Sequence, residues 1–145
     1  MVNDIWTQQW DIYPLDEITI TKNYNDFKDL SWERIKNVRD QNLISGVKVT
    51  IDGADKWFHT DIYSRTQWLG MVILGANLPA NVNWKTMDGS FVVLTPAIVL
   101  QVFSAIQIKE LTDFTNGETL KAQIYAAADP TLVDINVGWM PIYKG

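Results

Sequence analysis

Cysteine is absent from this 145-residue chain, and histidine occurs once, at position 59. Without thiols, the protein can form neither a disulfide framework nor a reactive thiolate. With a single imidazole and no thiolate, a zinc site would lack its usual ligands. Carboxylates alone can bind calcium or magnesium, but the sequence has no D-x-D-x-D-G loop of the EF-hand kind. We therefore expect no metal and no cofactor.

An excess of basic residues is also lacking, because 12 Lys and Arg stand against 17 Asp and Glu, for a net charge of -5. Nucleic-acid binders show a basic face or stripe. The densest basic group here is Arg34, Lys36 and Arg39, with Glu33 and Asp40 among them. This mixture is typical of a solvated helix face, so no nucleic-acid partner is expected.

Long apolar runs are missing as well. No stretch approaches the roughly 20 apolar residues that a membrane-spanning helix needs. Residues 1–6 have neither a basic flank nor an apolar segment of the signal-peptide kind. We expect no membrane partner and no secretion signal.

The length fits one domain, and a hydrophobic fraction of 47% fits a folded one. Residues 1–30 have few helix signals and predict an extended N-terminal arm, in which Glu17–Thr21 alternates as a short strand. The domain proper is predicted over 31–145. It begins with a helix capped by Asp29 or Ser31 and ended by Gly46.

Two similar units follow, each with a Thr-x-Asp-Gly turn, at 50–53 and at 86–89. The first predicts strands over 47–51 and 56–60 and a helix over 64–76. The second predicts strands over 84–87 and 90–94, the latter apolar on both faces and therefore central. A helix then starts at Thr95-Pro96, with a break at Asn116-Gly117 and a second piece over 118–128. The tail from 131 onward is predicted to be extended.

The predicted fold class is therefore α+β. Two β-hairpin–helix units form a small antiparallel sheet with helices packed on it, and an extended arm precedes them.

Catalytic chemistry has few candidates. His59 and Asp61 could pair as a base and its orienting carboxylate, but no serine lies in a G-x-S-x-G context. A histidine that ends a strand explains the same pattern. Among the acids that could serve a glycosidase, Asp52, Asp55, Asp61 and Asp88, three fall in turns or caps, where aspartate bonds its own backbone. We expect a binding protein and no enzyme.

Aromatic residues are the feature that remains. The chain has seven tryptophans, and aromatic side chains are frequent anchors at protein interfaces. Those outside the predicted core elements are the expected partner-binding residues: Trp6, Trp10, Tyr13, Trp139 and Tyr143. Two alternatives stay open, namely stacking on sugar rings and packing of the arm on its own domain as an edge strand.

Several stretches also carry a family resemblance, above all W-F-H-T-D at 57–61 and W-K-T-M-D-G-S-F at 84–91. Further matches lie at 46–49, 64–65, 74–80 and 94–96. Together they resemble a bacteriophage and prophage domain family of unknown function found in tail-fibre assembly proteins. The resemblance covers about 31–143. It brings no catalytic residues with it.

The resemblance implies a chaperone-like assembly protein that binds a phage tail-fibre protein in the host cytoplasm. It would cover strand edges of the unassembled fibre by strand addition. The implied assembly is a homo-oligomer or a complex with a trimeric fibre. The alternative is a structural virion component of the tail or fibre, acting as a docking module or as a carbohydrate-binding module for the host surface.

Overall fold

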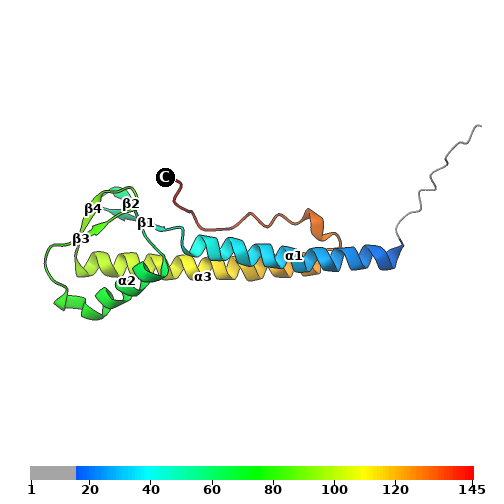
Figure 1. Ribbon diagram of the computed structural model, residues 1–145, viewed down its shortest axis with the longest axis horizontal. Coiled ribbons are helices and arrows are strands. Elements are labelled where there is room, and N and C mark those ends of the chain that lie inside the picture. The colour runs from blue at the N-terminus through cyan, green and yellow to red at the C-terminus, as the bar shows by residue number, and fades with distance from the viewer. Residues whose placement is uncertain (1–15) are drawn as a thin grey trace, which may run out of the picture.

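The computed structural model describes residues 16–145 and has an elongated shape (Figure 1). Two long helices, α1 (Glu17–Leu43) and α3 (Pro96–Ala126), lie side by side and antiparallel. Two hairpins and the shorter helix α2 (Ile62–Leu74) gather at one end of this pair. The predicted α+β class with two hairpin–helix units is confirmed.

Helix α1 begins much earlier than predicted. Asp16 is its N-cap, and its carboxylate accepts a hydrogen bond from the Thr19 N–H at 2.7 Å. The strand predicted over 17–21 is therefore wrong, and 17–30 are helical where an extended arm was expected. The alternating apolar and polar residues of 17–21 do not mark the buried face of a strand, since Ile18 is 83% exposed. The rest of the predicted arm, 1–15, lies outside the described residues.

The first hairpin pairs β1 (Val47–Ile51) with β2 (Ala54–Phe58) in an antiparallel register that sets Val47 opposite Phe58. Asp52 and Gly53 form the two-residue turn with φ of 49° and 80°. Positive values at both positions belong to the type I′ turn, which matches the twist of paired strands. Along β1 the alternation holds, with Val47, Val49 and Ile51 buried.

The second hairpin pairs β3 (Val82–Lys85) with β4 (Phe91–Leu94), and Trp84 lies opposite Val92. The prediction that β4 is central and buried on both faces is wrong, because Phe91 is 65% exposed. The reason is topological: each hairpin remains a separate two-stranded sheet. A hydrogen bond from the Met87 N–H to the Trp57 carbonyl oxygen, at 2.9 Å, links the two hairpins.

Helix α3 starts where predicted, with Thr95 as N-cap and Pro96 in the first turn. The predicted break at Asn116-Gly117 is wrong, because the helix continues to Ala126. Gly117 is buried, and a Cβ there would lie 3.5 Å from Ile35 Cγ2 of α1. This glycine permits close helix packing and does not end the helix.

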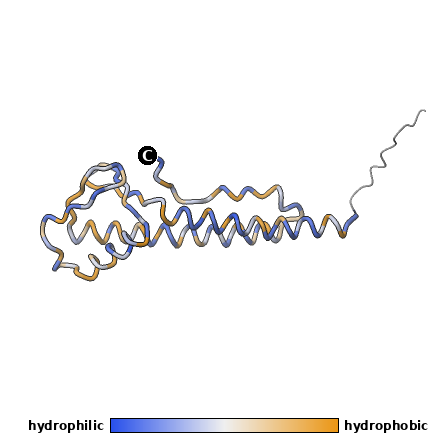
Figure 2. Tube along the Cα trace, in the orientation of Figure 1, coloured by the Kyte–Doolittle hydropathy of each residue, from blue (hydrophilic) through white to orange (hydrophobic). Residues whose placement is uncertain are grey.

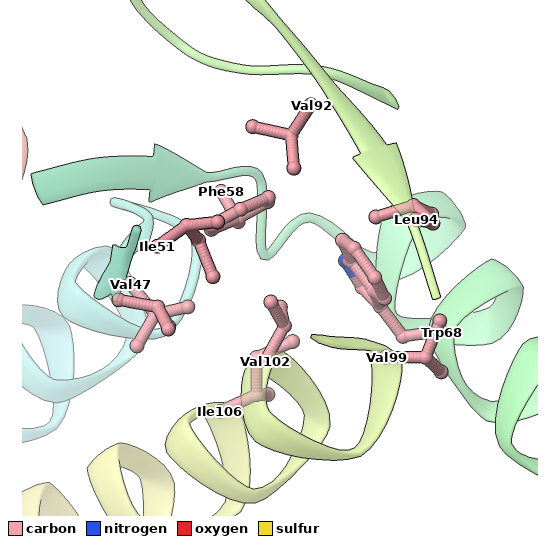
Figure 3. Close-up of a cluster of buried hydrophobic side chains, with 10 residues drawn as sticks. Val47, Ile51, Phe58, Trp68, Val92, Leu94, Val99, Val102 and Ile106 are labelled. Carbon is pink, nitrogen blue, oxygen red and sulfur yellow. The ribbon is translucent and has the colours of Figure 1, made fainter. Parts of the chain in front are cut away.

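Two apolar clusters hold the structure together. Figure 3 shows the larger one, in which strands and helices converge on Phe58, Trp68 and Val102, all fully buried. The Phe58 and Trp68 rings meet edge to face at 5.6 Å, and Trp84 lies 4.3 Å from Trp68. The smaller cluster joins α1, α3 and the C-terminal segment around Ile35, Leu120 and Ile124.

Two 3₁₀ turns complete the chain, η1 (Gly75–Asn77) after α2 and η2 (Pro130–Leu132) after α3. Beyond η2, the chain has no regular secondary structure and runs back along the helices toward the strands (Figure 1). We call residues 133–145 the tail. The prediction of an extended tail from 131 onward is only partly correct, because Pro130–Leu132 form a 3₁₀ turn and 135–138 form a turn and a bend, whereas 139–145 have no turn.

Candidate functional site

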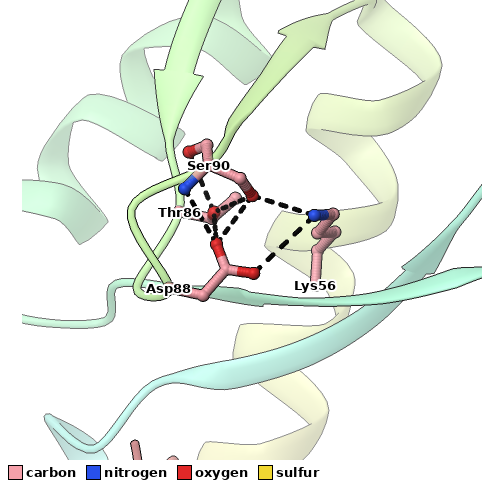
Figure 4. A network of polar contacts seen from close by, with 4 residues as sticks. All are labelled: Lys56, Thr86, Asp88 and Ser90. Carbon is pink, nitrogen blue, oxygen red and sulfur yellow. Dashed lines mark hydrogen bonds and ion pairs between the residues drawn. The ribbon is translucent and has the colours of Figure 1, made fainter.

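The turn between β3 and β4 holds the densest polar network in the described part of the chain (Figure 4). Asp88 Oδ1 accepts hydrogen bonds from the hydroxyls of Ser90, at 2.6 Å, and Thr86, at 2.5 Å. The Lys56 ammonium donates to Ser90 Oγ at 2.8 Å and lies 3.7 Å from Asp88 Oδ2. The Ser90 and Thr86 hydroxyls hold the pKa of Asp88 well below its usual range.

A serine beside a lysine can mark a nucleophile, but only if the lysine can accept the serine proton. Here the Lys56 ammonium is the donor, and the Ser90 hydroxyl already donates to Asp88. The network therefore fastens the second hairpin to β2 of the first. Its geometry accounts for structure without requiring a reaction.

His59 and Asp61 do not form the pair that a general base would need. Asp61 caps α2: its Oδ1 accepts from the N–H groups of Tyr63 and Ser64, each at 3.1 Å. Its Oδ2 accepts from the Ser64 hydroxyl at 2.7 Å. The Ser64 hydroxyl is the main cause of a lowered pKa at Asp61. Both oxygens thus serve the helix N-terminus.

A pocket of about 310 Å³ lies between the end of α1 and the middle of α3. Leu43, Ile106 and Phe114 supply its apolar surface. Its charged walls are already paired, as in Arg39 with Asp40 at 2.9 Å, or Arg65 with Glu110. Most charges around the pocket are therefore paired, whereas the buried Asp113 Oδ2 has no hydrogen-bond partner among the described residues.

Helix α2 carries one of the exposed apolar surfaces of the described residues, and α3 carries another with Ile108, Leu111 and Phe114. Ile62, Leu69 and Ile73 recur at i, i+7 and i+11 and all face solvent, with Ile73 77% exposed. The opposite side of α2 carries Trp68 into the core. Figure 2 contrasts this apolar helix with the largely hydrophilic α1. We call Ile62, Leu69 and Ile73 the α2 stripe. An amphipathic helix needs one apolar face for its own core, and α2 has a second.

The hairpins present a further surface for association. Because each sheet has two strands, each strand has one edge that pairs with no other strand among residues 16–145. Unpaired edges accept an added strand. On β4, the outward side chains Phe91 and Val93 are exposed beside such an edge.

The aromatic residues proposed from the sequence fall into two groups. Trp6, Trp10 and Tyr13 lie outside the described residues. Trp139 is half-buried against the smaller apolar cluster, and its indole N–H donates to the Ile135 carbonyl oxygen at 2.9 Å. Tyr143 is also half-buried and packs on Trp57 with 5.7 Å between ring centroids. Trp139 and Tyr143 thus contact their own domain.

Sequence reasoning missed an ion pair in the interior of α3. Lys109 Nζ lies 3.5 Å from Asp113 Oδ2, and both side chains are only 4% exposed. Burial lowers the pKa of Lys109, while the Asp113 carboxylate acts in the opposite direction. The signal was available, because both residues continue the buried helical spacing of Val102, Ile106 and Leu120.

Residues 16–145 contain no cluster of three or more His, Asp or Glu side chains arranged to hold a metal ion. None of the helices in this range is both long and apolar enough to cross a membrane.

A comparison with protein families matches residues 26–137 to the model described as domain of unknown function (DUF4376). Neither the curated proteins nor the solved structures yielded a match to this chain. The family match spans both hairpins, α2, α3 and most of α1, so the chain is a member of the DUF4376 family.

Proposed function

We propose that this protein is a phage tail-fibre assembly protein that binds an unassembled tail-fibre protein and covers its exposed apolar surface and strand edges. The α2 stripe is the observation that carries the proposal. Three large aliphatic side chains face solvent on one helix, whose other side is already anchored in the core through Trp68. Such a surface favours association with an apolar partner.

The strand edges supply the second contact. A fibre tip exposes strand edges before its three chains assemble, and an added strand satisfies the unpaired main-chain groups on both sides. The described hairpins offer edges of this kind at one end of the molecule. The acidic net charge of -5 keeps the free protein soluble while it carries apolar surface. The expected partner assembly is the trimeric fibre, and the expected place is the host cytoplasm.

Co-expression with the fibre protein tests the proposal. The fibre is expected to be soluble and trimeric when this chain is present, and to aggregate when it is absent. A fibre that is fully soluble and trimeric alone would remove the need for a chaperone.

The variant Leu69→Gln/Ile73→Gln is expected to lose the solubilising effect, because it makes the α2 stripe polar without adding charge. Ile18→Gln is the matched control, since Ile18 is as exposed as Ile73 but lies on α1. If both variants rescue the fibre equally well, the α2 stripe is not the contact.

The exposed aromatics Tyr63 and Phe91 favour a second function. Both rings could stack on sugars of the host surface, which would suit a permanent virion component of the tail or fibre. Mass spectrometry of purified virions separates the two functions. A defined copy number in mature particles would identify a structural component, whereas presence only in infected-cell lysate would identify an assembly protein.

A further inference from the structure

The tail lies along the paired helices and is held largely by side chains that bind its backbone. Asn116 Nδ2 donates to the Val137 carbonyl oxygen at 2.9 Å. At the far end, the Tyr143 N–H donates to the Ser45 carbonyl oxygen at 3.1 Å. Contacts to backbone groups depend little on the side chains of the bound segment, but a Cβ at position 138 would collide with Asn116, so the segment needs glycine there.

The buried ion pair of α3 serves the same purpose. Asp113 Oδ1 accepts a hydrogen bond from the Met140 N–H at 2.8 Å. Lys109 Nζ donates to the Pro141 carbonyl oxygen at 3.0 Å. A buried ion pair carries a desolvation cost that good geometry and further hydrogen bonds must offset. Here the further bonds go to one donor and one acceptor of the tail backbone, so the pair is built to hold a peptide segment.

Two aromatic anchors add side-chain selectivity. Trp139 lies over Gly117, where the position of a Cβ would be 3.6 Å from Trp139 Cη2. A Cβ would just fit there at ordinary contact distance, whereas a larger side chain at position 117 would displace the indole. Four residues later, Tyr143 packs on Trp57. We call the surface beneath the tail the groove; it is formed by Ser45, Trp57, Lys109, Asp113, Asn116 and Gly117. It suits a segment with two aromatic residues four positions apart and a glycine just before the first of them.

The outer side of the tail is open. Val137 and Ile142 are exposed, and neither belongs to an apolar cluster. The helices beneath pack on each other and on the hairpins through contacts that do not involve these residues. The tail can therefore leave without dismantling the larger apolar cluster.

We propose that the groove holding residues 137–143 is a docking site for an extended segment of the partner protein, and that the tail is its resident occupant. The identity of that partner as the fibre protein rests on the proposed function. The partner segment replaces the tail on Lys109 and Asp113 and inserts its own aromatic side chain over Gly117. Because only the open fraction of molecules can bind, the tail lowers the apparent affinity for the partner.

A fluorescent peptide with the sequence of residues 134–145 is the probe, and fluorescence anisotropy reports its binding to the full chain. Trp139→Ala weakens the tail but leaves the groove intact. It is expected to bind the peptide about tenfold more tightly than the wild type, because the open fraction rises.

A disulfide lock supplies the second test. Position 116 faces position 138, since Asn116 Cγ lies 2.9 Å from the position of a Cβ on Gly138. A cysteine sulfur near that Cγ would be within bonding reach of a second cysteine. Gly138 has a φ of 79°, so a cysteine at position 138 is strained in the oxidised and the reduced form alike, and comparing the two forms isolates the effect of the disulfide. The chain has no other cysteine, so Asn116→Cys/Gly138→Cys can form one disulfide only. The oxidised form is expected not to bind the peptide, and the reduced form of the same variant is its matched control.

Three results would overturn the inference. Equal binding to the oxidised and reduced forms would place the peptide elsewhere. Absence of binding to both the reduced form and Trp139→Ala, with native circular dichroism, would show that the groove does not exchange its occupant. A wild-type dimer in analytical ultracentrifugation that the oxidised lock abolishes would make the tail of a second copy the occupant.

Binding measurements with the fibre protein distinguish failure of this inference from failure of the proposed function. If the oxidised lock still binds fibre as the wild type does, the groove is not the fibre's docking site and the proposed function stands. If the peptide binds as expected but no fibre binds, the groove is a docking site and the proposed function fails.

Discussion

Loss of one member of the buried Lys109–Asp113 pair should be among the most destabilising single changes in the described part of this protein. The ammonium and carboxylate lie 3.5 Å apart with 4% of each side chain exposed. Removing one charge leaves the other buried and unpaired, which costs about 3–5 kcal/mol of stability. Because domains of this size are stable by only about 5–15 kcal/mol, Lys109→Met is expected to lose a large share of the free energy of unfolding.

Removing both charges should be less damaging than removing one. In Lys109→Met/Asp113→Leu no charge remains unpaired. The freed backbone groups of Met140 and Pro141 lie in a partly exposed segment, where water can replace the lost hydrogen bonds. The double variant is therefore expected to be more stable than Lys109→Met.

Guanidinium unfolding followed by tryptophan fluorescence measures the two single variants, the double variant and the wild type as one thermodynamic cycle. A cost below about 1 kcal/mol for Lys109→Met would contradict the desolvation argument. Additive costs in the double variant would also refute it.

The pH dependence gives a further check on Lys109. Burial lowers its pKa below the ordinary value of 10.5. Just below pH 10.5 the folded state therefore binds fewer protons than the unfolded state, and stability through this group rises with pH. Lys109→Met should remove that rise.

Three other predictions concern single positions. Asp61→Ala removes the N-cap of α2 and should lower the free energy of unfolding by about 0.5–2 kcal/mol, measured by chemical denaturation; no change would mean that the cap is dispensable. Gly117→Ala should be near neutral or stabilising, since a Cβ meets only ordinary contacts at 3.5 and 3.6 Å and alanine favours helix. Gly117→Leu should overpack this site and lower the free energy of unfolding by about 1–3 kcal/mol. Thermal melts in which the leucine variant is the more stable of the two would contradict the packing. The lowered pKa of Asp88 contributes stability that is present above its ordinary value of 3.8 and is lost as pH falls through the folded-state pKa. Asp88→Asn should therefore reduce the loss of unfolding free energy on acidification, measured by chemical denaturation at several pH values. An unchanged pH dependence would count against the turn network.

Local chemistry was enough to predict that both hairpins form and where α3 starts, although β2 and β3 each lie two residues earlier than predicted. Asp52-Gly53 supplies the two positive φ angles of its turn, and Thr95-Pro96 caps and begins its helix by side-chain and ring geometry alone. These signals act within a few residues and need no tertiary partner.

The errors arose where tertiary packing decides. Gly117 indicates a helix break when only its neighbours in sequence are considered, yet it lies buried within α3, where Ile35 and Trp139 leave room for nothing much larger than a methyl group. The apolar run of β4 reads as buried on both faces, yet no third strand covers Phe91. Alternation in 17–21 reads as a strand, whereas the Asp16 cap starts a helix there.

The candidate site was only partly predictable. The sequence singled out Trp139 and Tyr143 as partner-binding residues, and that role stays a prediction; the structure places both in the tail, with Trp139 on the smaller apolar cluster and Tyr143 on Trp57. The groove itself depends on Lys109 and Asp113, whose helical spacing carries the signal but whose pairing with a distant backbone does not appear in local sequence. The α2 stripe needed the structure, because only the fold decides which apolar side of a helix is covered.

The most direct measurement of the central claim is a competition titration, in which each purified chain displaces fluorescently labelled wild-type chain from the soluble complex that it forms with unassembled fibre protein on co-expression. The wild type and Ile18→Gln should bind with equal affinity. Leu69→Gln/Ile73→Gln should bind about tenfold more weakly, because the loss of two interface side chains is expected to cost about 1.4 kcal/mol together. Equal affinities for all three chains, or no binding by the wild type, would contradict the assignment of the α2 stripe as the surface that binds the fibre.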